Sequence, residues 1–253
     1  MNNIQNGSLF CAPEPIRLLC LGDSLTDGFW LPGGYRNTLC RLLTENGLSS
    51  AVQFLGINES GTGYDTHHAG FSSFATVDIA ESVTGGRRGI AGMLDEVLQC
   101  GTPDVIFLQI GTNDILSLYE LDRFRFRLTA ICERLLRGMR ADGMLYLGQL
   151  APLDAHDPTF IDPRFFTQES ADAALAECNR QIAETAARLS AEGKPVSLAD
   201  AGSILTKADL HDGVHPTAEG YEKLGLFWFS TLARELNRRR MLSVTSLVTG
   251  KRA

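Results

Sequence analysis

Residues 16–28 read IRLLCLGDSLTDG, an apolar run that leads directly into a turn with a serine. A short run of apolar residues is typical of a strand in a buried parallel sheet. Ser24 follows this run on a tight turn, which would lie at the carboxyl edge of the sheet, where open α/β folds bind their ligands. An ordinary capped turn explains Gly22–Leu25 equally well. This stretch alone therefore indicates a fold class and not yet a function.

The rest of the chain repeats this alternation of short apolar runs with stretches of helical period. The predicted strands are 16–21, 52–55, 105–110, 145–150 and 196–198. Between them, apolar residues recur at spacings of three and four over 121–135 and 175–189. A last helix is expected near Thr217, whose hydroxyl would cap it. The pattern predicts a doubly wound three-layer α/β/α sandwich around a five-stranded parallel sheet.

The composition fits a folded α/β protein of 253 residues, with 44% apolar and 21% charged residues. A net charge of -7 gives no support to a broad basic surface, so a nucleic-acid partner is not expected. No linker or repeat divides the chain, so we expect one domain over 1–253, with its core at about 16–237. The remaining 238–253 form a basic tail that carries no acid and five bases, Arg238, Arg239, Arg240, Lys251 and Arg252.

The N-terminal residues lack the positive and apolar regions of a secretory signal, and no apolar run is long enough to cross a bilayer. A cytoplasmic protein without a membrane partner is therefore expected, although removal of a leader would leave the same pattern. The cysteines contain no CxxC pair, which indicates reduced thiols. They are Cys11, Cys20, Cys40, Cys100, Cys132 and Cys178.

Two further motifs follow predicted strands. Residues 109–114 read QIGTND, in which the Asn113 carboxamide is suited to direct an N–H at a developing oxyanion, although Gly, Asn and Asp also form ordinary turns. Residues 211–216 read HDGVHP, in which Asp212 is three residues before His215. A carboxylate at this spacing can orient an imidazole that takes the proton of a serine. The spacing favours His215 over His211.

The three motifs end separate strands, so a doubly wound sheet would bring them to one edge. Together they resemble the SGNH, or GDSL, hydrolase family over nearly the whole chain, from 22 to 216, which implies a flavodoxin-like fold. The resemblance implies that Ser24 is the nucleophile, His215 the general base and Asp212 the acid that orients it.

The resemblance also implies an oxyanion hole made of the Asn113 carboxamide, the backbone N–H of Ser24 and a glycine N–H. The family places that glycine in a segment resembling His-Glu-Gly-x-Ser-Gly. Here residues 67–73 read HHAGFSS, so Gly70 is the expected donor. The segment departs from the pattern at Ala69 and Ser73.

Residues 33–36, GGYR, and 52–56, VQFLG, are similar to the third carbohydrate esterase family, whose members remove acetyl groups from xylan and are usually secreted. Trp30, in a loop with proline and two glycines, is suited to form a pocket wall, although core packing explains aromatic residues equally well. The residues expected to bind substrate are Asp23, Trp30, Tyr35 and Arg36.

We therefore expect a serine esterase for short-chain acetyl esters, acting on O-acetyl groups of a small or oligosaccharide substrate. The scheme requires no metal and no organic cofactor. One alternative is a lipid acyl-ester or thioester hydrolase with the same triad. Another is a catalytically silent binding module, against which the complete set of four side chains argues. The oligomeric state stays open.

Three other segments contain residues of types found at functional sites. His67 and His68 with Asp65 suggest a metal site, but adjacent histidines do not readily face one ion and no HxH or HExxH pattern is present. Residues 85–89, GGRRG, are favoured as a solvated loop over an anion-binding one, with a role at the edge of the site left open. The long loop 151–169 contains three aromatics that would form a mobile lid, Phe160, Phe165 and Phe166.

Overall fold

The computed structural model describes residues 14–160 and 165–249, without the side chains of 240–249. Its centre is β1 (Ile16–Gly22), which pairs in parallel with β5 (Val105–Gln109) on one side. On the other side β1 pairs with β2 (Val52–Leu55) and, at its carboxyl end, with β4 (His67–Gly70). The sheet is completed by β3 (Asn58–Glu59), β6 (Met144–Gly148) and β7 (Val196–Ala199).

The mostly parallel sheet predicted from the apolar runs is confirmed, and each of the five expected strands is present. The sheet has seven strands rather than five, because β4 pairs with the end of β1 and β3 pairs antiparallel with β4. Sequence periodicity missed both, since β3 is two residues long and β4 reads HHAG, without an apolar run.

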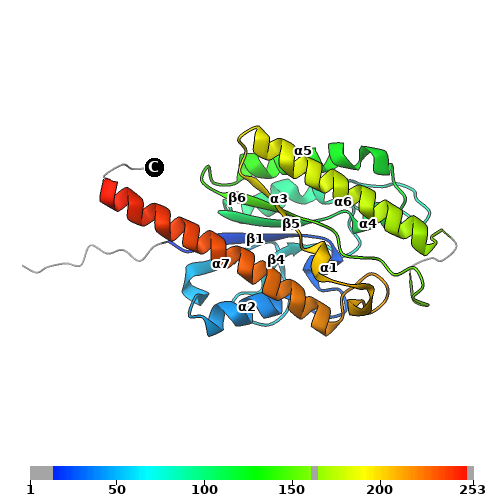
Figure 1. Ribbon diagram of the computed structural model, residues 1–253, viewed down its shortest axis with the longest axis horizontal. Coiled ribbons are helices and arrows are strands. Elements are labelled where there is room, and N and C mark those ends of the chain that lie inside the picture. Colours follow the sequence, from blue (N-terminus) through cyan, green and yellow to red (C-terminus); the bar gives the residue numbers. More distant parts are fainter. Residues whose placement is uncertain (1–13, 161–164, 250–253) are drawn as a thin grey trace, which may run out of the picture.

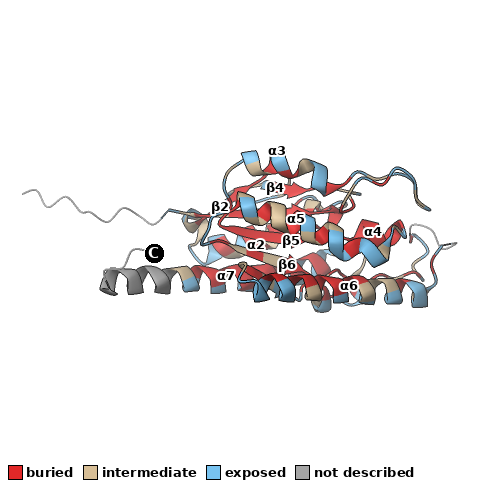
Figure 2. Cartoon of the chain, turned by 90° about the horizontal axis from the view of Figure 1, so that it is seen from above, coloured by how far each residue is buried: buried red, intermediate tan, exposed pale blue. Residues whose placement is uncertain are grey.

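Helices cover both faces of the sheet, as expected for a three-layer sandwich (Figure 1). On one face lie α2 (Tyr35–Glu45) and α7 (Ala218–Thr249). On the other lie α3 (Leu94–Gln99), α5 (Phe124–Gly138) and α6 (Gln168–Ala191). Figure 2 shows buried strands between helices whose outer faces are exposed.

Strand β1 divides the core because its successive side chains point to opposite faces. Leu19 and Leu21 pack in the cluster that α3, α5 and α6 cover, whereas Leu18 and Cys20 pack in the cluster under α2 and α7. Full burial raises the pKa of the Cys20 thiol to about 12. The strand is therefore apolar on both faces from Leu18 to Leu21, as expected from the opening stretch of sequence.

The helices follow the predicted patterns closely. The pattern at 121–135 forms a short 3-10 turn (Leu121–Arg123) and then α5, and the pattern at 175–189 lies within α6. The hydroxyl of Thr217 accepts the N–H of Gly220 at 3.1 Å, so it caps α7 as expected. The basic segment 238–253 begins as a continuation of α7 to Thr249, and 250–253 lie outside the described residues.

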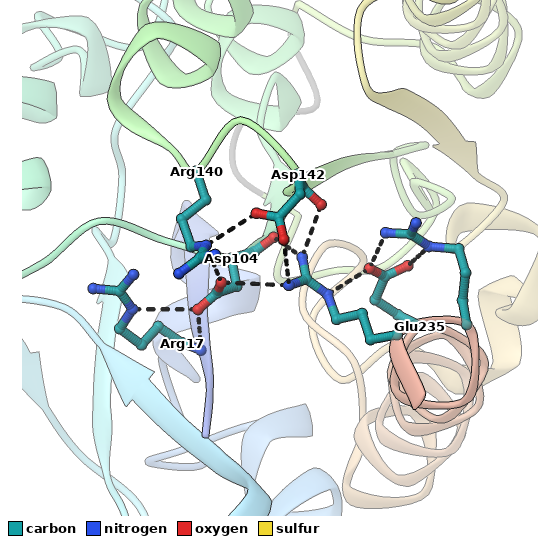
Figure 3. Close-up of polar contacts among 7 residues, drawn as sticks. Arg17, Asp104, Arg140, Asp142 and Glu235 are labelled. Atoms are coloured by element: carbon teal, nitrogen blue, oxygen red, sulfur yellow. Dashed lines mark hydrogen bonds and ion pairs between the residues drawn. The ribbon is translucent and has the colours of Figure 1, made fainter. Parts of the chain in front are cut away.

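At the amino edge of the sheet, a group of ion pairs ties the start of β5 to β1 and α7 (Figure 3). The buried Asp104 carboxylate lies 3.2 Å from Arg17 Nε, 3.1 Å from Arg140 Nε and 3.4 Å from Arg239 Nη1. Arg239 also pairs with Glu235, one turn earlier on α7, at 2.8 Å. We call Arg17, Asp104, Arg140 and Arg239 the amino-edge cluster.

Across the described stretches, no helix is both long enough and apolar enough to span a bilayer.

Candidate active site

Strand β1 ends in a turn that only a glycine permits. A Cβ on Gly22 would lie 2.3 Å from the carbonyl oxygen of Gln109 on the neighbouring strand, far inside contact distance. The one-turn helix α1 (Ser24–Asp27) follows, capped by Asp23 Oδ1, which accepts the N–H of Leu25 at 3.1 Å. The turn therefore places Ser24 at the carboxyl edge of the sheet, beside the end of β5.

Three side chains from two distant parts of the chain form one line of hydrogen bonds at this edge. Ser24 Oγ lies 2.8 Å from His215 Nε2, and His215 Nδ1 lies 2.7 Å from Asp212 Oδ2. The other carboxylate oxygen, Asp212 Oδ1, accepts the backbone N–H groups of Val214 at 3.0 Å and of His215 at 2.7 Å. With Nδ1 donating to the carboxylate, Nε2 is left to accept the serine proton.

Two aspartates near the serine have pKa values that are shifted in opposite directions. Burial disfavours the charge of Asp212, but hydrogen bonds from the ring and backbone of His215 outweigh it and lower the pKa to about 2. For Asp23 burial prevails and raises the pKa to about 6, and its Oδ2 has no hydrogen-bond partner among the described residues. Asp212 is therefore ionised at neutral pH, as a carboxylate that stabilises an imidazolium must be.

Asn113 comes from the end of β5, on the short helix α4 (Thr112–Leu116). The helix is preceded by Gly111 at φ +136°, where a Cβ would also lie 2.7 Å from the Phe124 ring. Asn113 Nδ2 donates to the carbonyl oxygen of Phe74 at 2.9 Å, which fixes the orientation of the carboxamide. An amide nitrogen has two hydrogens, so a second one is left to donate.

The structure corrects the expectation for Gly70. Its backbone N–H donates to His68 Nδ1 at 3.0 Å within the buried end of β4, so it is already used. Ser73, three residues later, lines the pocket beside Ser24 and has φ +66°, in the left-handed region that glycine favours. Its N–H makes no hydrogen bond to another described residue. The signal was in the sequence, because Ser73 stands where the family pattern has its last glycine.

These groups surround a pocket of about 230 Å³. The ring of Phe29 stacks on the imidazole of His215 with centroids 4.9 Å apart, and it is 59% exposed. Arg87 and Thr159 come from the two loops whose role the sequence left open. The lining residues are Ser24, Phe29, Ser73, Arg87, Asn113, Leu116, Thr159, Asp212, Val214 and His215.

Comparison with known families gives the identification. A model of the GDSL-like lipase/acylhydrolase family matches residues 20–223, which include all three sequence motifs. The chain belongs to this family. The resemblance predicted from the motifs is confirmed, and the family is one of lipases and acylhydrolases.

This GDSL hydrolase is also similar to individual esterases. It is 31% identical over 237 residues to a multidomain esterase of Ruminococcus flavefaciens, a match that spans 88% of this chain and 29% of that protein. The structure is similar to a family 3 carbohydrate esterase of Clostridium thermocellum, with 25% identity, a TM-score of 0.67 and coverage of 88% and 98%. The fold also matches a family 3 carbohydrate esterase from Talaromyces cellulolyticus at 21% identity and a TM-score of 0.66, covering 88% and 99%.

The four residues expected to bind substrate in this GDSL hydrolase do not line the pocket. Tyr35 is buried against Trp228, and Asp23 is the buried cap of α1. Arg36 is buried too, and it donates to the backbone carbonyls of Thr26, Asp27, Ser60 and Thr66. Arg36 therefore ties the end of α1 to the loop between β3 and β4, and so holds the backbone behind the serine.

Trp30 also has a supporting position. Its indole N–H donates to the carbonyl oxygen of Pro216 at 2.8 Å, and its ring stacks on His211 at 4.5 Å. Trp30 therefore braces segment 211–216, which carries Asp212 and His215. Periodicity and composition could not distinguish this brace from a pocket wall, because both use an aromatic ring near the motif.

The prediction of an aromatic lid is wrong for Phe160 and Phe166. Phe160 and Phe166 are buried and pack edge to face with centroids 5.6 Å apart, in the same core cluster as α5 and α6. Phe165 is exposed, and residues 161–164 of this loop lie outside the described part.

The histidine pair is split between two environments. His67 is exposed and bonds Asp65 Oδ1 at 2.8 Å, whereas His68 is buried and has its pKa lowered by that burial to about 3. In the described ranges, no group of three His, Cys, Asp or Glu side chains has an arrangement that would hold a metal ion.

Proposed function

We propose that this GDSL hydrolase is a serine esterase that removes acetyl groups from carbohydrates through an acyl-enzyme. The hydrogen-bonded line Ser24–His215–Asp212, open to a pocket, is the observation that carries the proposal. The carbohydrate part rests on relatives whose names include carbohydrate esterase family 3.

The first chemical step uses the line of hydrogen bonds. As Ser24 Oγ attacks the ester carbonyl carbon, His215 Nε2 takes its proton over the 2.8 Å contact. The ionised Asp212 carboxylate stabilises the imidazolium and orients it through the hydrogen bond to Nδ1. Its two hydrogen bonds from the backbone N–H groups of residues 214 and 215 hold the carboxylate in place. The alcohol then leaves with the proton of His215, and water activated by the same imidazole hydrolyses the acyl-enzyme.

The negative charge that develops on the carbonyl oxygen requires donors fixed before the reaction. We assign them to the Asn113 carboxamide and to the backbone N–H groups of Ser24 and Ser73. Ser73 replaces Gly70 in this role because its N–H has no acceptor among the described residues and it lines the pocket.

The size of the pocket supports a small acyl group. Its volume of about 230 Å³ is below the range of roughly 300–1,000 Å³ typical of sites for larger ligands, and Phe29, Leu116 and Val214 give it apolar walls. A long acyl chain, as in the lipid-hydrolase alternative, would extend outside this space.

The test is hydrolysis of p-nitrophenyl esters of increasing chain length beside acetylated xylo-oligosaccharides. We expect activity to fall steeply beyond acetyl, acetate to be released from the oligosaccharides, and Ser24→Ala to lose turnover while still folded. Ser197→Ala is the matched control, since its hydroxyl makes only a 3.4 Å bond to Leu198. Wild-type rates in Ser24→Ala would refute the mechanism, rates that rise with chain length would favour the lipid alternative, and inactivity on every ester would favour a binding module.

A further inference from the structure

The pocket contains one fixed cation among its described lining residues, and the mechanism does not use it. Arg87 belongs to the segment 85–89, and its backbone forms two hydrogen bonds with Ile79. Its Nε donates to Ser117 Oγ at 2.8 Å, Nη1 to the carbonyl oxygen of Ser73 at 3.4 Å, and Nη2 to Thr84 Oγ1 at 3.1 Å. The guanidinium is therefore held in one orientation at the wall of the pocket.

All three of these acceptors are neutral. In the part of the chain that the structure describes, no carboxylate lies within ion-pair distance of Arg87. Arg127 shows the contrast, because it is similarly buried but pairs with Asp114 at 3.2 Å. Burial disfavours the charge of Arg87 and lowers its pKa, but a guanidinium remains protonated in proteins. A half-buried cation without a counterion is costly unless a ligand supplies one.

Nearby carboxylates are otherwise engaged. Asp212 accepts three hydrogen bonds from residues 214 and 215. Asp114 binds Arg127 and the N–H and hydroxyl of Thr76. Asp23 caps α1 through Oδ1 and forms no ion pair with Arg87 among the described residues, although its charge and that of Asp114 act on Arg87 from farther away. The positive charge of Arg87 is thus left for a group that enters the pocket.

We propose that Arg87 binds a carboxylate carried by the ester substrate, and so selects esters that have a negative charge close to the scissile bond. The inference rests on the proposed function and specifies its substrate class. One N–H remains on each terminal nitrogen of Arg87 after the bonds to Ser73 and Thr84, and a carboxylate accepts two such donors at once.

Two other roles for Arg87 give different results. A cation that only stabilises the developing oxyanion would speed hydrolysis of neutral and charged esters by the same factor. A guanidinium that only joins the loops at Ser73, Thr84 and Ser117 would affect stability and all substrates alike. Only recognition of a substrate carboxylate changes the ratio between charged and neutral esters.

The experiment compares esters that differ in one carboxylate. The first pair is 3-acetoxybenzoate and 3-acetoxybenzamide, with the charge on the alcohol side. The second is the mono-4-nitrophenyl ester of fumaric acid and its amide, with the charge on the acyl side. At about 0.15 M salt, we expect the wild-type kcat/KM to be higher for the charged member of one pair, and the pair concerned identifies the side that Arg87 faces.

The variants are Arg87→Gln and Arg87→Lys, with Arg88→Gln as the control. Arg88→Gln removes the same charge from the adjacent position. The Arg88 guanidinium lies over the Phe74 ring, 5.2 Å from its centroid, and Arg88 does not line the pocket. We expect Arg87→Gln to reduce the ratio of charged to neutral kcat/KM by about 10- to 100-fold, Arg87→Lys to reduce it less, and Arg88→Gln to leave it unchanged.

A wild-type enzyme without preference for the charged member of either pair overturns the inference, whatever the variants do. A ratio unchanged in Arg87→Gln, or an equal loss on charged and neutral esters, overturns it too. If Arg87→Gln does not fold, the wild-type preference and Arg87→Lys still decide. Failure of the esterase proposal is separate, because it would appear as hydrolysis that survives Ser24→Ala or as inactivity on every ester, charged and neutral.

Discussion

At the scale of single residues, two aspartates beside the reacting groups have pKa values that their surroundings shift in opposite directions. Asp212 receives three hydrogen bonds and stays ionised, whereas Asp23 is buried with one oxygen unpartnered. A pair of carboxyl groups with such different environments takes different roles. In the proposed mechanism Asp212 supports the base, and Asp23 shapes the turn that carries the nucleophile.

Asp23 makes the free energy of unfolding depend on pH. Its pKa of about 6 in the fold lies above the ordinary 3.8, so the fold holds the proton more tightly than the unfolded chain. This stabilisation is complete below about pH 4 and is lost as the pH rises through 6, a change of roughly 3 kcal/mol. Asp23→Asn keeps the cap to Leu25 but removes the titration. Between pH 4 and 7 we expect the variant to gain stability relative to wild type, as measured by chemical unfolding at each pH.

A difference between Asp23→Asn and wild type that stays constant from pH 4 to 7 would contradict this account. The unpartnered Oδ2 of Asp23 becomes an amide in the variant, which adds a cost that does not vary with pH. Therefore only the change with pH of the difference in unfolding free energy between the variant and wild type tests the pKa of Asp23.

Asn113 gives the second prediction at this scale. Asn113→Ala removes a donor that Phe74 holds in place, and we expect kcat to fall by about 10²- to 10³-fold with little change in KM. The readout is steady-state hydrolysis of p-nitrophenyl acetate, with circular dichroism to show that the variant folds. A loss below about threefold would remove Asn113 from the oxyanion hole.

At the scale of secondary-structure elements, the sequence predicted what periodicity encodes and missed what tertiary contacts decide. The five predicted strands and the helices α5, α6 and α7 have the apolar patterns expected of buried elements. Strand β4 forms only because the end of β1 offers a free edge, so its residues show no strand pattern. The wrong donor, Gly70, lies on that unpredicted strand, where its N–H turns to His68.

The crossing of α2 and α7 depends on a residue with no side chain. A Cβ on Gly225 of α7 would lie 2.4 Å from Thr38 Cβ on α2. Gly225→Val should therefore separate the helices and destabilise the protein by about 1–3 kcal/mol, seen as a lower Tm. Ser230→Val is the control, because it places the same branched side chain on the exposed face of α7. Equal Tm values for the two variants would show that the close crossing is not required.

At the scale of the whole molecule, the candidate active site and the amino-edge cluster of ion pairs lie at opposite edges of one sheet. The carboxyl edge carries the serine, the base and the pocket, and the amino edge carries the amino-edge cluster (Figure 3). The motifs predicted the first edge because each comes after a strand in the chain. No motif marked the second, since its arginines and Asp104 resemble any solvated charge in sequence.

The amino-edge cluster predicts a variant that is less stable but active. Asp104→Asn leaves Arg17, Arg140 and Arg239 around a neutral group, and we expect a loss of about 2 kcal/mol, because the buried carboxylate is removed while its partly exposed partners can hydrate. The kcat per folded molecule should not change. The measurements are chemical unfolding and p-nitrophenyl acetate hydrolysis. Asp142→Asn is the control, and we expect it to lose less stability because the Asp142 side chain is 63% exposed. A reduced kcat would mean that the two edges are coupled.

The hydrogen bond between Ser24 and His215 joins residues 191 positions apart. Protein synthesis runs from the N-terminus, and domains fold as their residues become available. A growing chain therefore exposes its serine early but has no imidazole to take the proton until segment 211–216 has been translated. In the proposed mechanism, esterase activity therefore becomes available only late in synthesis, at the stage when α7 begins to pack on the sheet.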